Sequence, residues 1–440
     1  MAKKCADRRT FDRKMSARLV AVAVLLAAAV AAEEAATPEV SYEHFRLLRV
    51  QVADKEQMAA VFRLSMELDG VQLWATHNMS TQLDLLVAPT AWTNITTELN
   101  QSGIKYSIII ENLQDSIRNE NPPMEPEEEE WENRSGHRLT WKRYHHYKDI
   151  ESYVDYLANT YPEICQMEVI GQTSEGRPLK VLKISTGGAA KPAVWIDGGI
   201  HAREWIAPAT VTYLLLQLVE FRHDHPWLID DLDWYVLPVV NPDGYEYSHT
   251  TDRLWRKTRS AGDGQCVGVD ANRNFDSHWL EVGASSDPCS SIYAGSRPFS
   301  EPETKAMTDF ILSRRDEIKV YLTLHSYGQM WLVPWGYKAD KPDDYYDMYV
   351  LAEQGVEALE RVRNTDYLLG TADELIYTSS GGSDDWAKEK AGIKYAYTVE
   401  LPDTGRYGFV LPAAHIELVG QEVWEGVKGM MLYFTKNISV

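Results

Sequence analysis

Three short apolar runs in this chain each lead into a residue that can bind a metal ion or work beside one. The runs cover residues 193–200, 320–324 and 394–399, and they lead into His201 with Glu204, into His325, and into Glu400. Short apolar runs predict buried strands, and in an open α/β sheet the ligand site lies beyond the carboxyl ends of the strands. We therefore expect these four residues, although far apart in sequence, to meet at one edge of a sheet.

Two histidines and one glutamate predict a catalytic zinc site, because three protein ligands leave a position open for water. His201, Glu204 and His325 would supply the ligands, and Glu400 would be free to take a proton from that water. An isolated His-x-x-Glu pair often occurs by chance. This pair gains weight because it follows an apolar strand and a Gly198-Gly199 turn, where we expect it to open a helix. The expected cofactor is one Zn²⁺ per chain.

Length and charge limit the possible classes of protein. A chain of 440 residues has room for about two or three domains. The formal charge of −21 argues against a nucleic-acid partner, which would require a basic face. Part of the excess lies in residues 125–130, an acidic run that is typical of a solvated linker.

The N-terminus has the pattern of a secretory signal. Basic residues precede an apolar stretch from Leu19 to Ala32, which is too short to span a bilayer comfortably. We interpret residues 1–32 as a signal peptide, with Met15 as an alternative start. The expected product is a secreted, extracellular protein with no membrane partner after the signal is removed.

The cysteines agree with export. Cys266 and Cys289 lie 23 residues apart (289 − 266) across a loop rich in Gly, Ser and Asp. We expect a disulfide between them, because secreted chains keep such bonds. Cys165 is then left as a small core residue.

Residues 38–113 predict a small domain of their own. The strands expected at 45–52, 71–76, 82–87 and 105–110 alternate with helices expected at 55–68 and 91–99. This βαββαβ order predicts an α+β, ferredoxin-like antiparallel open sandwich. No chemical constellation is evident in it. Residues 114–134 are polar and acidic, and they predict a linker with a helical part.

Residues 135–440 predict a larger α/β domain. Strands alternate there with long amphipathic segments at 208–221, 301–314, 345–361 and 421–434. We expect a mixed, mainly parallel sheet with helices on both faces.

Several motifs stand in the order found in the zinc metallocarboxypeptidase A/B family, which the chain resembles from about residue 135 onward. They are His201-Ala202-Arg203-Glu204-Trp205, Asn241-Pro242-Asp243-Gly244-Tyr245, Arg253 to Lys257, Gly268 to Asn274, His325-Ser326-Tyr327, Ile376-Tyr377, and Glu400 through Phe409. The small preceding domain resembles the family's activation peptide. Carboxypeptidase A is itself the known example of a two-His, one-Glu zinc site, so this ligand set also follows from the resemblance.

The resemblance implies a role for each matching residue. His201, Glu204 and His325 match the zinc ligands, Glu400 the general base and acid, and Arg256 the residue that polarises the scissile carbonyl. The residues that match the clamp for the substrate's terminal carboxylate are Asn272, Arg273 and Tyr377. Those that match subsites beyond the cut bond are Arg203, Tyr327 and Phe409. Asp270, from the Gly268–Asn274 motif, could orient a histidine ring as a second carboxylate or simply cap a turn.

Asp384 predicts the specificity of the enzyme. It matches the base of the side-chain pocket, where B-type enzymes carry Asp and A-type enzymes an apolar residue, whereas both types share Asp385. A buried carboxylate requires a cationic partner, and the small Ala372 on the pocket wall leaves room for a long side chain. One extra residue between Trp386 and Gly392 departs from the family pattern and could shift the pocket loop.

We therefore expect a secreted, monomeric zymogen that removes C-terminal Lys or Arg from peptides. The small domain, which carries no chemistry of its own, should cover the cleft until a trypsin-like protease cuts the chain near Arg134 or Arg138. One alternative is an A-type or broad-specificity carboxypeptidase. The other is a non-catalytic homologue that only binds carboxylates.

Overall fold

The computed structural model describes residues 39–77, 81–123, 136–262, 264 and 266–438. The expected signal peptide, the acidic run at 125–130, Arg134 and Ser135 lie outside these ranges. The described residues from Ser41 onward form one compact unit. In the described ranges, no helix is both long enough and apolar enough to cross a membrane.

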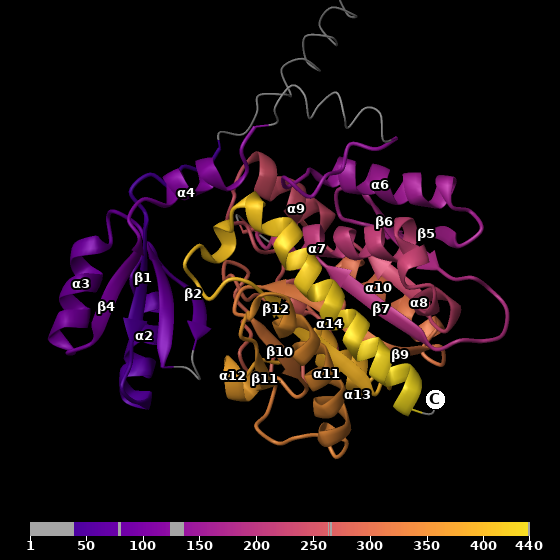
Figure 1. Ribbon diagram of the computed structural model, residues 1–440. Helices are drawn as coiled ribbons and strands as arrows, with labels where there is room; N and C mark the ends of the chain where they lie inside the picture. The colour runs from indigo at the N-terminus through magenta and orange to yellow at the C-terminus, as the bar shows by residue number, and fades with distance from the viewer. Residues whose placement is uncertain (1–38, 78–80, 124–135, 263, 265, 439–440) are drawn as a thin grey trace, which may run out of the picture. The chain divides into compact units, whose positions relative to one another are not determined.

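The first part of the unit, which we call the N-terminal region (residues 41–123), contains a four-stranded antiparallel sheet (Figure 1). Its strands are β1 (Arg46–Gln51), β2 (Val71–His77), β3 (Gln82–Val87) and β4 (Lys105–Ile110), in the spatial order β2-β3-β1-β4. The helices α2 (Lys55–Glu67) and α3 (Trp92–Gln101) pack on one face through Val61, Ile95 and Leu99. The predicted βαββαβ sandwich is confirmed. The polar stretch that follows contains one helix, α4 (Leu113–Glu120).

The second part, the C-terminal region (residues 136–438), is built on an eight-stranded mixed sheet in the order β11-β10-β12-β9-β7-β8-β6-β5. The strands are β5 (Cys165–Gln172), β6 (Pro178–Ile184), β7 (Ala193–Gly198), β8 (Asp233–Leu237), β9 (Ile318–Ser326), β10 (Met330–Val333), β11 (Leu368–Thr371) and β12 (Tyr395–Leu401). The four central strands β12, β9, β7 and β8 run parallel, which confirms the mixed, mainly parallel sheet.

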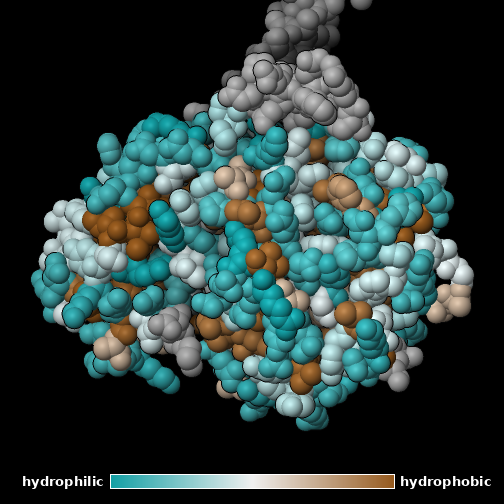
Figure 2. Space-filling view, viewed as in Figure 1, coloured by the Kyte–Doolittle hydropathy of each residue, from teal (hydrophilic) through white to brown (hydrophobic). Residues whose placement is uncertain are grey.

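Helices cover both faces of this sheet (Figure 1). The longer ones are α6 (Tyr147–Thr160), α7 (Ile206–Leu215), α9 (Pro242–Thr250), α10 (Pro302–Ser313), α11 (Tyr345–Arg363) and α14 (Ile416–Asn437), and the shorter ones α8 (Trp227–Asp230), α12 (Ala372–Leu375) and α13 (Ser383–Glu389). The C-terminal region has two main hydrophobic cores. In one, α6, α7, α11 and α14 pack against the sheet, and in the other, α10 and α13 pack against it. The surface in Figure 2 is mostly hydrophilic, with separate apolar patches.

Local sequence explains several element boundaries. The Asp54 side chain accepts a hydrogen bond from the Gln57 backbone N–H and starts α2, and Asn241 starts α9 in the same way. Gly199 ends the turn after β7 with φ +66°, and a Cβ atom there would lie 2.8 Å from Pro208. Glycine is therefore needed where the chain leaves the sheet for the metal ligands.

Two details differ from the sequence interpretation. His325 and Glu400 lie within the last residues of β9 and β12, because strand pairing continues through both. His201 and Glu204 do not open a helix. They lie in the turn between β7 and α7, which begins only at Ile206.

Candidate metal centre and substrate cleft

Strand pairing brings the four chemically active residues together. β9 lies between β7 and β12 in the parallel core, and Glu400 pairs directly with His325 in the ladder. His201 and Glu204 follow β7, the neighbour of β9 on the other side. The edge of the sheet that the sequence predicted therefore carries all four.

Three of these residues form a cluster that could hold a metal ion. One ligand atom from each of His201, Glu204 and His325 lies within 4.8 Å of the others, and all three residues are buried. The Nδ1 atoms of the two histidines are 3.1 Å apart. Glu204 lies 2.8 Å from His201 Nδ1 through one carboxylate oxygen and 3.3 Å from His325 Nδ1 through the other.

The cluster fits zinc chemically. Two imidazole nitrogens and a carboxylate converge on one point, which is a zinc donor set with positions to spare. The opposite nitrogen of His201, Nε2, lies 3.2 Å from Asp270 Oδ1, and a carboxylate behind a ligating histidine fixes the ring and its tautomer.

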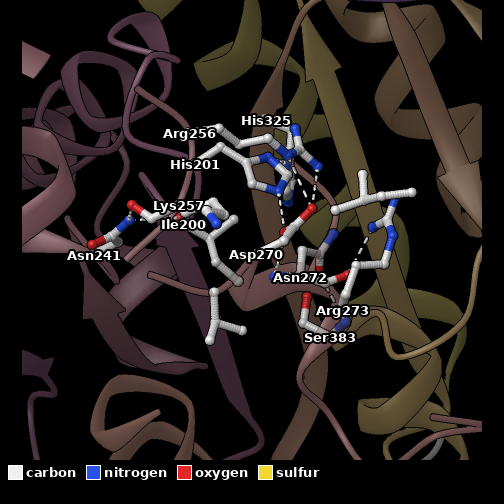
Figure 3. Close-up of polar contacts among 12 residues, drawn as sticks. Ile200, His201, Asn241, Arg256, Lys257, Asp270, Asn272, Arg273, His325 and Ser383 are labelled. Carbon is white, nitrogen blue, oxygen red and sulfur yellow. Dashed lines mark hydrogen bonds and ion pairs between the residues drawn. The ribbon is translucent and has the colours of Figure 1, made fainter. Parts of the chain in front are cut away.

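Asp270 links the cluster to an arginine (Figure 3). Its Oδ2 accepts a hydrogen bond from Arg256 Nε at 2.9 Å and forms an ion pair with Arg256 Nη2 at 2.8 Å, while Oδ1 accepts a hydrogen bond from the Asn272 backbone N–H. Although burial opposes ionisation, Arg256 and His201 hold the pKa of Asp270 well below its usual value. A charged Asp270 can therefore orient both His201 and Arg256, beyond capping its turn.

Glu400 is the carboxylate without a fixed partner. Its Oε2 is buried and, among the described residues, has no hydrogen-bond partner. Burial raises the pKa of Glu400 to about 8, and Glu204 and Asp384 raise it against the opposing pull of His325 and Arg256. A carboxyl group with a pKa near the working pH suits proton transfer in both directions.

The residues predicted to hold a terminal carboxylate also lie together. Arg273 Nη2 donates to the Tyr377 hydroxyl at 2.8 Å, and its Nε donates to the Gly283 carbonyl at 2.9 Å. Asn272 accepts a hydrogen bond from the Ser383 backbone N–H at 2.9 Å through its Oδ1 (Figure 3). This bond ties the predicted carboxylate clamp to the start of α13, one residue before Asp384.

Asp384 and Asp385 differ in their surroundings, although both are buried. Asp385 accepts two hydrogen bonds from the Gly336 backbone N–H and so holds the pocket wall. Asp384 lines the cleft, and no ion pair joins it to a described Lys, Arg or His. Burial raises the pKa of Asp384. A cation in the cleft would reverse that shift.

The predicted upstream subsite is an aromatic and cationic cluster. The Arg203 guanidinium lies 3.9 Å from the centre of the Phe409 ring, and Tyr327 contacts the same ring edge-on. Burial, together with the charge of Arg256, lowers the pKa of Arg203 to about 10.

One cleft joins these groups. Its lining includes the metal ligands, Arg256, Glu400, Ala372, the predicted carboxylate clamp, Asp384, Tyr327 and Phe409. Arg203 and Asp270 are not part of that lining.

The sequence predicted that the small N-terminal domain covers the cleft, but not which of its residues reach it. Trp74, Ala75 and Thr76 of β2 also line it. Further along, Glu120 forms two buried hydrogen bonds to Arg253, at the Nε and Nη2 atoms. The sequence gives little signal for Trp74. Glu120 and Arg253 each sit in polar stretches that resemble an exposed surface.

The disulfide between Cys266 and Cys289 is confirmed. It closes the loop that carries Asp270, Asn272 and Arg273. Cys165 is free and buried, and burial raises its pKa to about 12, so it behaves as a core residue.

Comparisons with known proteins identify both regions. Residues 150–426 match the model of the zinc carboxypeptidase family, and residues 48–120 match that of the carboxypeptidase activation peptide. Carboxypeptidase B of Astacus astacus is 51% identical over 292 residues, which cover 66% of this chain and 96% of that protein. Carboxypeptidase A2 of Mus musculus is 40% identical over 395 residues, covering 88% and 93%.

A solved structure agrees. Carboxypeptidase A from Helicoverpa armigera superimposes with a TM-score of 0.81 at 30% identity, covering 91% of this chain and 99% of that one. The relatives thus include both A and B types. The chain belongs to the zinc carboxypeptidase A/B family, as a zymogen with its activation peptide.

Proposed function

We propose that the mature enzyme is a B-type carboxypeptidase, which releases C-terminal Lys or Arg from peptides. The observation that carries this proposal is Asp384, a buried carboxylate that lines the cleft and forms no ion pair with any described residue. A substrate Lys or Arg would supply the missing charge, because a buried carboxylate is costly unless it is paired.

The remaining residues would act in a fixed order along the substrate. Asn272, Arg273 and Tyr377 would hold the terminal carboxylate, for which the planar guanidinium of Arg273 is suited. Arg203, Tyr327 and Phe409 would contact residues upstream of the cut bond.

The chemistry would use two further residues of the chain. His201, Glu204 and His325 would hold the zinc ion, which would supply the Lewis acidity that makes water a nucleophile near neutral pH. Glu400 would accept the proton from the attacking water and pass it to the leaving amine. Arg256, held by Asp270, would stabilise negative charge on the scissile carbonyl oxygen.

A residue-preference profile tests the specificity. Peptides that differ only in a C-terminal Arg, Lys, Phe or Leu are offered to the trypsin-treated protein. We expect Arg and Lys to exceed Phe by roughly 10²–10³-fold in kcat/KM, because an apolar side chain leaves Asp384 buried and unpaired. Asp384→Ile should lose activity on Arg and gain some on Phe, whereas Asp340→Asn in an exposed loop should change neither.

The outcomes separate the alternatives. Equal turnover of Phe-ending and Arg-ending peptides by the wild-type protein would identify an A-type or broad-specificity enzyme. Binding of these peptides without turnover by zinc-loaded protein would identify a non-catalytic homologue.

The chain architecture suggests how activity is controlled. We propose a secreted monomer in which residues 1–32 direct export, residues 38–113 form the activation peptide, residues 114–134 form the linker, and residues 135–440 form the enzyme. A trypsin-like protease would cut at the end of the linker. The contacts of Trp74, Ala75 and Thr76 with the cleft support an inhibitory role for the N-terminal region.

A further inference from the structure

Asp84 is an acidic residue in the middle of an apolar strand. It lies on β3 between Leu83 and Leu85, and its side chain is fully buried. Carboxylates are rarely buried completely unless they are paired. β3 also lies between β2 and β1 in the sheet of the N-terminal region, so its partners come from both sides.

Two residues of the N-terminal region hold this carboxylate in place. Arg49, its register partner on β1, donates from Nε and Nη2 to the two oxygens, each at 2.8 Å. His77 Nε2, at the end of β2, lies 2.7 Å from Oδ2. The bidentate arginine pair fixes the plane of the carboxylate.

The same cluster reaches into the C-terminal region. The Tyr327 hydroxyl donates to Asp84 Oδ2 at 3.0 Å, and Arg49 Nη2 donates to the Thr404 carbonyl at 2.8 Å. A Cβ atom at Gly405 would lie 2.0 Å from Arg49 Nη2 and 2.7 Å from Asp84 Oδ2. Glycine at 405 therefore lets the two regions approach closely enough for these bonds.

Apolar residues pack beside the cluster. Trp74 packs edge-on against Phe409 at 5.1 Å, and a buried cluster joins Leu47 and Leu86 to Tyr327 and Val410. Such packing stabilises the contact by burying apolar surface, but it does not fix the orientation of the two regions. The hydrogen bond to Tyr327 adds a directional contact that a shifted docking would lose.

We propose that Asp84 is the recognition residue through which the activation peptide docks on the mature enzyme, by capturing the hydroxyl of Tyr327. The surface around Tyr327, Thr404 and Gly405 is then the interface that binds the ion pair between Asp84 of β3 and Arg49 of β1. While the bond persists, Tyr327 is withheld from the peptide substrate. This part rests on the proposed function, in which Tyr327 contacts residues upstream of the cut bond.

The test uses the full-length, zinc-loaded chain as wild type, Asp84→Asn, Tyr327→Phe and the double variant. Asp54→Asn is the matched control, because it is the same change at an exposed helix cap. The first readout is amide hydrogen exchange of the uncleaved chain over residues 326–330 and 402–410, which requires no activity. The second is the activity of each uncleaved variant divided by its own activity after trypsin treatment, on an Arg-ending tetrapeptide.

We expect both single variants to raise exchange and the activity ratio about 10-fold or more, as for a lost hydrogen bond to a charged group. The double variant should not exceed Asp84→Asn, because Tyr327→Phe removes only a bond that Asp84→Asn has already disrupted. Asp54→Asn should match wild type. If Asp84→Asn fails to fold, Tyr327→Phe, which leaves Arg49 and His77 paired with Asp84, carries the test.

Unchanged exchange in a folded Tyr327→Phe variant would overturn the proposal, as would fully additive effects in the double variant. Failure of the proposed function looks different. The trypsin-treated wild-type protein would then not cut the tetrapeptide, while the exchange readout would still report on the contact between Asp84 and Tyr327.

Discussion

Single side chains set the reactivity of the cleft, and Glu400 illustrates how. Its backbone is fixed by pairing with β9 and β10, yet one of its carboxylate oxygens has no partner among the described residues. Burial keeps its pKa high, at about 8. The fold thus holds the position of this carboxylate rigidly and leaves its proton exchangeable.

Replacing Glu400 by Gln tests its assigned role as the base. The amide keeps the shape of the side chain but cannot accept the proton, so we expect kcat to fall by at least about 10²-fold. The zinc content should stay at one per chain, because the ligands are other residues. Zinc measurement alongside steady-state kinetics checks both, and loss of zinc together with activity would make Glu400 a ligand or a structural residue.

Glu303 lies outside the cleft and should contribute to a different property, the pH dependence of stability. It is fully buried; one oxygen accepts a 3.4 Å hydrogen bond from the Ser174 backbone N–H, and the other has no hydrogen-bond partner among the described residues. Burial raises its pKa to about 8, with Glu301 and Asp243 adding to the shift.

The sign of the effect follows from this raised pKa. Below pH 4.5 the carboxyl group is protonated in both states, and above that value only the unfolded chain releases the proton, until the folded state follows near pH 8. Wild-type stability should therefore fall across this window by up to about 1.4 kcal/mol per pH unit relative to Glu303→Gln. Thermal unfolding of both proteins from pH 5 to 9 measures the difference, and parallel curves would contradict the prediction.

At the scale of helices and strands, much of the architecture was predictable. β3 and β4 have the predicted bounds, and β1, α2 and α3 differ from theirs by one or two residues. These elements follow local periodicity and turn chemistry. The helix expected at His201 was wrong, because the tight turn that presents two ligands leaves no room for helical hydrogen bonds until Ile206.

The loop closed by Cys266 and Cys289 is the element that presents Asp270, Asn272 and Arg273. Replacing both cysteines by Ser should cost about 3 kcal/mol of stability on the loop-entropy model. It should also raise KM more than it lowers kcat, because Asn272 and Arg273 are proposed to hold substrate. Unfolding curves and kinetics measure both effects, with mild reduction of the wild-type protein as the control, and an unchanged KM would show that the loop keeps its shape without the bond.

At the scale of the whole molecule, the sequence predicted the content of each region and that the small domain covers the cleft, but not the residues that join the two regions. The proposed zinc ligands and cleft residues were recognisable because they stand in ordered motifs. Asp84 and Tyr327 are 243 residues apart, and no periodicity or motif links them. The sequence shows Asp84 only as a single acidic residue in an apolar strand, and the strand pattern alone does not identify its partner.

Proteolytic activation tests how the regions work together. Arg138 is exposed, but the next residue, Leu139, is buried in the core of the C-terminal region, and His137 packs against Tyr153 and Tyr156. Of the two predicted cleavage points, we therefore expect trypsin to cut after Arg134, which lies outside the described residues. N-terminal sequencing should find Ser135, and activity should rise on cleavage. Equal activity before and after cleavage would refute an inhibitory activation peptide.

The parallel pairing of β9 with β12 allows the specificity of the enzyme to change in evolution without a change in the positions of the reacting groups. His325 and Glu400 are neighbours because backbone hydrogen bonds set them opposite each other, and a slip of one residue would turn Glu400 to the other face. The chain between them adds β10 and β11 to the sheet, and its segment 372–394, which includes Ala372, Tyr377 and Asp384, lies outside the strands and does not alter that spacing. Substitutions and insertions in this segment can therefore change which C-terminal residue the enzyme releases, while His325 and Glu400 keep their separation.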